Sequence, residues 1–141
     1  MPIYTSIPTG LPIRQDSCSL VDVSWKRRGL TALFSFSRMG EPRPQAVRVT
    51  FESIIVMRVV DEMVYSLEER GNDVGIMRDG FAYEVTDSPF LRTMTEASNL
   101  TYKNPKQYTF ISLSDCLDVI AKSLPQFDVI DLRPWLDSMG L

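Results

Sequence analysis

Apolar and polar residues alternate along much of this chain, with the period of two that is typical of β-strands that bury one face. Residues 18–25 and 30–38 both follow this pattern, and a short polar turn that ends at Gly29 separates them. Two alternating runs around a short turn containing glycine predict a β-hairpin. Regular structure is therefore expected to begin near Cys18.

The first 17 residues carry three prolines, at Pro2, Pro8 and Pro12. Because proline cannot continue a helix or donate a hydrogen bond within a central strand, we expect residues 1–17 to form an extended arm. The arm lies either over the domain or loose in solvent. Residues 18–141 then form a single β-rich domain, which is long enough to bury a core.

The longest apolar run spans residues 45–63. Its first half alternates cleanly, whereas residues 54–60 are apolar on both faces except at Arg58. A straight strand of about 14 residues would be about 46 Å long, which exceeds the usual strand length. We therefore expect a bulge or bend near Glu52 and Ser53, where the chain passes from one sheet to another.

Other strands follow later in the chain. A tight turn at Asp79–Gly80 precedes an alternating run over residues 81–85, and residues 107–113 and 116–123 predict a second hairpin. Residues 115–122 also keep helical spacing, but the β-branched residues in this segment favour a strand. A short edge strand and a helical turn after Pro134 are expected to end the chain.

The strongest helix signal lies at residues 88–98, where Ser88 is a natural N-cap and Pro89 suits the first helical position. Residues 62–70 fit a helix or a loop, and both alternatives stay open. Together these elements predict an α+β fold of mainly antiparallel strands. The strands form either one bent sheet or two packed sheets, with one helix near residues 88–98.

The composition excludes several classes of chemistry. The chain has no histidine, which removes every nucleophilic mechanism that relies on a Ser–His or Cys–His pair. Its two cysteines, Cys18 and Cys116, are far apart in sequence, so we expect reduced thiols and no zinc or iron site. No cofactor is expected, and no catalytic residue is predicted.

The net charge of −3 argues against nucleic acid as the main partner, because phosphate-binding surfaces need clustered Lys and Arg. The basic stretch at residues 26–28 is better interpreted as a solvated turn. The N-terminus lacks the features of a signal peptide, and no apolar run reaches the ~20 residues of a membrane helix. We therefore expect a cytoplasmic protein with no membrane partner, and the oligomeric state stays open.

A charged cluster at the end of the long run is the first candidate site. Arg58, Asp61 and Glu62 could hold a basic group of a partner or a ligand. The alternative, which we favour, is that Arg58 lies among buried residues and needs a carboxylate as its counter-charge.

Four aspartates form pairs three residues apart, Asp115 with Asp118 and Asp128 with Asp131. On a helix such a pair would share one face and suit a hard cation. The favoured interpretation is that all four are turn and surface aspartates. No metal site is predicted.

Aromatic residues supply the remaining candidates. Trp25 is expected to pack inside the domain, whereas Trp135, in the C-terminal tail, is the better candidate for a partly exposed contact with a partner. Under an alternative function, Phe81, Tyr83 and Tyr108 line a concave sheet face that binds a small ligand or a carbohydrate.

Three segments resemble a group of small, uncharacterised, immunity-like bacterial proteins: "VTFESIIVMRVVDE", "YEVTDSPFL" and "QYTFISLSDCLDVIAKSLP". The resemblance covers about residues 47–125. In that group the tyrosine of the third segment often follows a histidine, whereas here it follows Gln107. The resemblance implies a compact β-rich cytoplasmic domain that binds and blocks a partner protein.

The first hypothesis is therefore a non-enzymatic protein-binding module, of the kind that neutralises a basic toxin. The mild acidity of the chain suits a basic partner. The second hypothesis is a β domain that binds a small ligand or carbohydrate. The third is a carboxylate-dependent enzyme.

Overall fold

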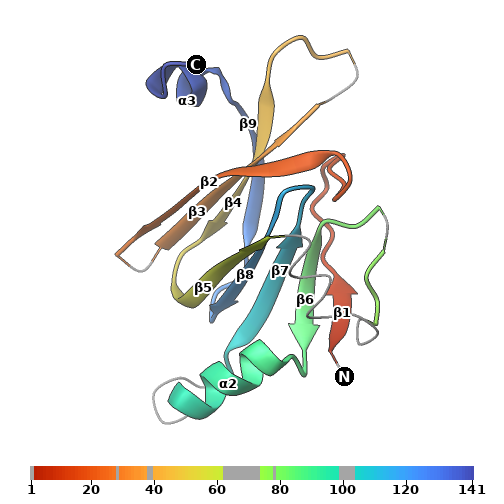
Figure 1. Cartoon of the computed structure of the whole chain (residues 1–141), viewed down its shortest axis with the longest axis vertical. Helices are drawn as coiled ribbons and strands as arrows, with labels where there is room; N and C mark the ends of the chain where they lie inside the picture. The colour runs from red at the N-terminus through yellow and green to blue at the C-terminus, as the bar shows by residue number, and fades with distance from the viewer. Residues whose placement is uncertain (1, 28, 38–39, 62–73, 78, 99–103) are drawn as a thin grey trace.

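The architecture was taken from a computed structural model of the chain, which describes residues 2–27, 29–37, 40–61, 74–77, 79–98 and 104–141. Two antiparallel sheets, with the strand orders β1-β6-β7-β8-β5 and β2-β3-β4-β9, form an open arrangement (Figure 1). The strands are β1 (Ile3–Ser6), β2 (Cys18–Lys26), β3 (Gly29–Phe36), β4 (Gln45–Phe51), β5 (Ile54–Asp61), β6 (Ala82–Thr86), β7 (Lys106–Ile111), β8 (Asp115–Ala121) and β9 (Gln126–Asp131). The predicted α+β fold of mainly antiparallel strands is confirmed, in its form with two sheets.

The long apolar run crosses from one sheet to the other, as its length predicted. β4 ends at Phe51 in the four-stranded sheet, and β5 begins at Ile54 in the five-stranded sheet. At this corner the Ser53 N–H donates to Ser123 Oγ over 3.3 Å, and Ser123 Oγ donates to the Ser53 carbonyl over 3.1 Å. Ser123 lies where the chain passes from β8 to β9, so two crossings are tied together at one corner.

Both predicted hairpins are present. β2 pairs with β3, and β7 pairs with β8, each in antiparallel register. Residues 115–121 are a strand, which settles the choice between strand and helix for that segment. The core between the two sheets is rich in aromatic rings, with Phe34, Phe51 and Phe110 each at most 1% exposed.

The helix prediction is also confirmed, because α2 spans Pro89–Ser98 and the Leu91 N–H donates to Ser88 Oγ over 2.9 Å. A second helix, α3 (Arg133–Ser138), fulfils the expectation of a terminal helical turn. Its residues Trp135 and Leu136 pack on the outer face of the four-stranded sheet. The open alternatives for residues 62–70 lie outside the described residues.

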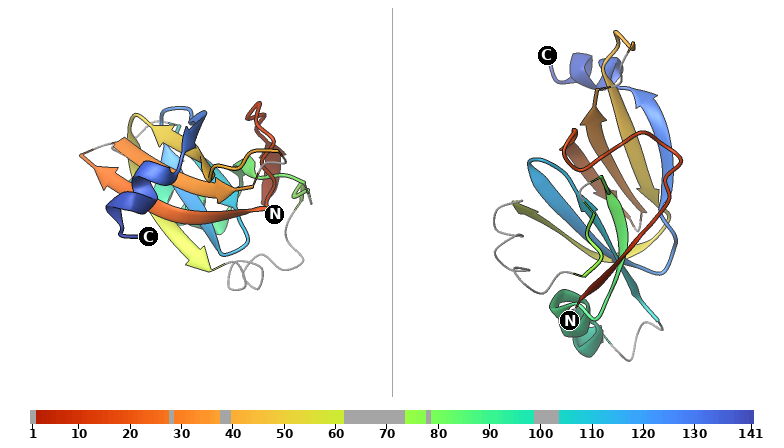
Figure 2. Two further views of the ribbon diagram at one scale, coloured as in Figure 1. Left: turned by 90° about the horizontal axis from the view of Figure 1, so that it is seen from above. Right: turned by 90° about the vertical axis from the view of Figure 1, so that its right-hand side faces the viewer.

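The N-terminal arm departs from the prediction that regular structure begins near Cys18. β1 is an edge strand and pairs antiparallel with β6 (Figure 2). Pro2 and Pro8 flank this strand without interrupting it, which is how an edge strand tolerates proline. Further along the arm, Ile13 is buried against the core, so the arm lies over the domain.

Candidate functional site

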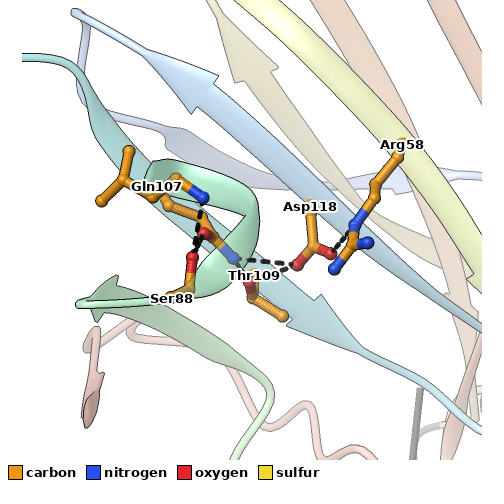
Figure 3. Close-up of polar contacts among 6 residues, drawn as sticks. Arg58, Ser88, Gln107, Thr109 and Asp118 are labelled. Atoms are coloured by element: carbon orange, nitrogen blue, oxygen red, sulfur yellow. Dashed lines mark hydrogen bonds and ion pairs between the residues drawn. The ribbon is translucent and has the colours of Figure 1, made fainter. Parts of the chain in front are cut away.

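A row of polar side chains lies on the outer face of the five-stranded sheet, on the opposite side from the core between the sheets. We call it the polar row; it consists of Arg58, Ser88, Gln107, Thr109 and Asp118 (Figure 3). The strand register explains why three of them meet. Thr109 on β7 and Arg58 on β5 are each directly opposite Asp118 on β8, between them.

Asp118 is the centre of the polar row. Its side chain is fully buried, and its two oxygens accept from Arg58, Gln107 and Thr109. Arg58 Nε donates to Oδ2 over 2.7 Å, while Thr109 Oγ1 and Gln107 Nε2 donate to Oδ1 over 2.5 Å and 3.3 Å. Three donors, one of them charged, offset the cost of moving this carboxylate out of water.

Gln107 connects the carboxylate to the start of α2. Its amide nitrogen also donates to Thr109 Oγ1 over 3.0 Å, and its amide oxygen accepts from the Ser88 hydroxyl (Figure 3). Ser88 is the N-cap of α2, so the cap that starts the helix is also bonded to the sheet. The polar row therefore fixes where α2 begins relative to β7 and β8.

The helix also contacts the other end of the polar row. The Arg58 guanidinium carbon lies 4.4 Å from the centre of the Phe90 ring, which is a cation–π geometry. The Arg58 side chain keeps 27% of its surface exposed, so it is the member of the row that reaches solvent. Phe90 and Asp118 thus hold the same guanidinium, one from α2 and one from β8.

This arrangement suits a structural task better than proton transfer. Both oxygens of Asp118 already accept hydrogen bonds, and the Ser88 hydroxyl is engaged by Gln107 and by the Leu91 N–H. A general base needs a lone pair within reach of a substrate proton. Fully satisfied buried networks instead hold neighbouring elements in one arrangement.

The structure assigns the counter-charge of Arg58 to Asp118, from across the sheet, whereas the sequence analysis looked for it among neighbouring residues such as Asp61 and Glu62. Asp61 is exposed at the end of β5, directly opposite Asp115. Glu62 lies outside the described residues. Asp118 is therefore a counter-charge of Arg58 that the sequence analysis did not name.

The expectation that all four paired aspartates are surface residues is wrong for Asp118. Its side chain lies on the outer face of the five-stranded sheet but is fully buried there. The expectation holds for Asp128, which forms an exposed ion pair with Arg48, and for Asp131, whose Oδ1 accepts from the Arg133 N–H. Asp115 and Asp118 point to opposite faces because they lie three residues apart on a strand.

The outcome differs among the aromatic candidates: Trp135 is partly exposed, as expected, whereas Trp25 is not buried. Trp135 is half-buried, and its Nε1 donates to Asp22 Oδ2 over 3.2 Å, whereas Trp25, expected to pack inside, is 46% exposed. Phe81, Tyr83 and Tyr108 are at most 3% exposed. These three rings therefore fill the interior and do not form the open sheet face that the alternative function requires.

Tyr83 shows why the strand pattern did not predict that these rings are buried. Its hydroxyl accepts from the Met77 N–H over 3.1 Å and donates to the Met77 carbonyl over 3.0 Å. A side-chain atom added at Gly80 would lie 1.9 Å from that hydroxyl, so glycine is needed there. Burial raises the pKa of Tyr83. The segment before β6 covers this ring, a contact that alternation within β6 cannot reveal.

A second feature is the side of the molecule where the two sheets stay apart, between the edge strands β2 and β5 (Figures 1 and 2). We call it the open side. At one end the Leu113 N–H donates to the Cys18 carbonyl over 2.9 Å.

Core-facing side chains line the open side. Val23 and Met57 are half-buried and pack against the core, whereas Trp25 and Val59 are 46% and 45% exposed. Each of these residues lies on the inner face of its sheet, because its partner across the ladder belongs to the core. The open side is therefore apolar, and at its end Asp61 is directly opposite Asp115.

Sequence reasoning missed most of the polar row. Gln107, Thr109 and Asp118 follow the two-residue alternation of strands, but their polarity indicated an exposed face instead of a buried network. The turn that the sequence predicts, at Ser114–Asp115, would set Thr109 opposite Ile120. The observed turn is centred one residue earlier, on Leu113 and Ser114, and this register sets Thr109 opposite Asp118. Ser88 was found, but only as a helix cap.

Within the described residues, no group of three or more His, Cys, Asp or Glu side chains is placed to hold a metal ion. Cys18 and Cys116 are buried and form no disulfide, and burial raises the pKa of the Cys18 thiol to about 12. None of the described helices has both the length and the apolar character to cross a membrane. No protein-family model matches the chain, and neither curated proteins nor solved structures give a match.

Proposed function

We propose that this protein is a non-enzymatic protein-binding module that holds its partner on the open side. The observation that carries the proposal is the exposure of Trp25 and Val59, which are 46% and 45% exposed although they lie on core-facing sides of their strands. Large apolar and aromatic side chains at the centre of an interface supply most of its binding energy.

Sheet edges are the second support. β2 and β5 are the outermost strands of their sheets among the described residues. An apolar edge strand invites contact with another chain, and β5 carries neither lysine nor proline to discourage it. The register of β2 shifts between Leu20 and Asp22, and that of β5 shifts between Ile54 and Val56, so β5 is regular from Val56 onward.

Charge indicates the kind of partner. Asp61 and Asp115 are opposite each other at one end of the open side, and the chain carries a net charge of −3. A partner that presents lysine or arginine there would meet complementary charge. An immunity-type inhibitor of a basic toxin fits this description, and it is the role that the resemblance to immunity-like proteins implies.

The test compares capture of proteins from the source cell by three immobilised forms. Val59→Lys places a charge in the middle of the open side, whereas Ile3→Lys adds the same charge on β1, at the opposite edge of the same sheet. Ile3 is 48% exposed and Val59 is 45% exposed, so the two substitutions start from side chains of similar exposure. We expect one basic protein to bind the wild type and Ile3→Lys but not Val59→Lys.

Association kinetics add a second readout. If Asp61 and Asp115 attract a basic partner, the association rate falls as salt rises from low to physiological concentration. Equal capture by Val59→Lys and the wild type would refute the open side as the interface. Capture of an acidic protein with kinetics insensitive to salt would refute the basic partner.

A further inference from the structure

A groove of about 340 Å³ lies on another part of the surface, where the N-terminal arm passes the turn between β8 and β9. This groove is formed by the arm, by β6 and β7, and by the β8–β9 turn. The residues that line it are Thr5, Ser6, Ile7, Pro8, Glu84, Tyr108, Leu124, Pro125 and Phe127. It shares no lining residue with the open side, and its size suits a small molecule.

Tyr108 is the notable member of this lining. Its ring is fixed in the core against Phe51, with the ring centres 5.6 Å apart, and only 1% of the residue is exposed. Tyr108 nevertheless lines the groove, and its hydroxyl has no hydrogen-bond partner in the part of the chain that the structure describes. This hydroxyl is not among the fully buried polar atoms that lack a partner, so it is open to the groove and can donate to a molecule that lies there.

The charges beside the hydroxyl narrow the choice of ligand. Glu84 is directly opposite Tyr108 on β6, and its carboxylate forms an ion pair with Lys106 over 3.3 Å. Burial and the charge of Glu84 raise the pKa of Tyr108, so the hydroxyl keeps its proton and can donate it. A carboxylate already paired with a lysine favours neither an anion nor a cation in the groove.

The walls of the groove are mostly apolar. Ile7 and Pro8 lie in the N-terminal arm, and Leu124, Pro125 and Phe127 lie in and after the β8–β9 turn. Leu124 is 72% exposed and forms part of one wall. An apolar groove with one well-placed polar group is the usual design of a site for a small ligand, in which the polar group sets the orientation.

We propose that this groove binds a small neutral ligand that has an apolar ring and one hydrogen-bond acceptor, and that the acceptor receives the hydroxyl proton of Tyr108. The ring lies between the walls of the arm and the turn. This site is separate from the open side and does not depend on the proposed protein partner.

The test uses two probes of nearly equal shape on the full chain, followed by amide chemical shifts in an NMR titration. Acetophenone has a ring and a carbonyl acceptor, and α-methylstyrene replaces that carbonyl oxygen with a CH₂ group. We expect acetophenone to bind the groove about three- to ten-fold more tightly, the effect of one hydrogen bond. The amides that shift should belong to the N-terminal arm and the β8–β9 turn.

Two variants assign the preference to one hydroxyl. Tyr108→Phe keeps the ring that packs on Phe51 and removes only the oxygen, so it should bind both probes equally. Tyr83→Phe removes a hydroxyl that is bonded to Met77 away from the groove, so it should keep the preference for acetophenone. Benzoate, an anion with a similar ring, should bind more weakly than acetophenone.

Three results would overturn the proposal. They are equal binding of the two neutral probes to the wild type, a preference that survives in Tyr108→Phe, and shifts confined to residues outside the groove. Absence of binding up to the solubility of acetophenone would also overturn it, because the hydroxyl would then serve only solvent. None of these results bears on the open side, which Val59→Lys tests separately.

Discussion

Two arginine–aspartate pairs in this molecule have the same position in their sheets, with the two residues directly opposite each other on neighbouring strands. They differ in how far they are buried. Arg58 is directly opposite Asp118 on β5 and β8, and Arg48 is directly opposite Asp128 on β4 and β9. Each pair lies on the outer face of its sheet. Arg58 Nε lies 2.7 Å from Asp118 Oδ2, while Arg48 meets both oxygens of Asp128, over 3.0 Å and 2.5 Å.

Burial separates the two pairs. The Asp118 side chain is fully buried and accepts from Gln107 and Thr109 as well, whereas the side chains of Arg48 and Asp128 are 44% and 47% exposed. The hydrogen bond to Asp128 raises the pKa of Arg48, but water competes for both groups. The comparison teaches that cross-strand pairing alone says little about how much a pair stabilises the fold.

The largest effect is expected for Arg58→Ala. It leaves the buried Asp118 without its charged partner and removes the contact with Phe90, so the free energy of unfolding should fall by about 3–5 kcal/mol. Chemical denaturation of the purified variant measures this loss. A loss below about 1 kcal/mol would show that the buried pair is no stronger than an exposed one.

The next effect concerns Thr109→Val, which keeps the shape of the side chain but removes a donor to Asp118. The carboxylate then loses a short hydrogen bond in a buried place, at a cost of about 1–3 kcal/mol. Denaturation of Thr109→Val together with Arg58→Ala gives a double-mutant cycle. We expect the two losses not to add, because both residues bond the same carboxylate; simple additivity would argue against a connected row.

A smaller loss is expected for Ser88→Ala, which removes the N-cap of α2 and the partner of the Gln107 amide oxygen. Loss of a cap of this kind costs about 0.5–2 kcal/mol. Hydrogen exchange should accelerate at the start of α2, including the Leu91 N–H, while β2 and β3 keep their protection. Uniform acceleration across both sheets would mean that the row does not act locally on the helix.

The smallest effect is expected for Arg48→Ala. Exposed ion pairs contribute about 0–1 kcal/mol, and this contribution shrinks as salt rises. Melting curves at low and high salt check both points. A loss as large as that of Arg58→Ala would break the comparison, because burial would then not be what distinguishes the pairs.

A large part of the fold was predictable because it depends on local patterns. The period of two identified both hairpins, the length of the run at residues 45–63 predicted the crossing near Ser53, and the cap at Ser88 predicted α2. These signals lie within single segments, where side-chain order and backbone chemistry act over a few residues. β1 was not predicted, because Pro2 and Pro8 argue against regular structure in the arm. Its partner strand, β6, lies far away in the sequence, so no local pattern indicates their pairing.

The sequence by itself determined the strand and helix segments and the absence of imidazole chemistry. Only the tertiary structure decided which side chains meet. Asp118 became a buried partner of Arg58 because the register of β5 on β8 set them opposite each other, 60 residues apart in the chain. Phe81 and Tyr83 became core residues because other segments cover them. Burial is a property of the assembled layers, and a strand pattern does not state which of its two faces another segment will cover.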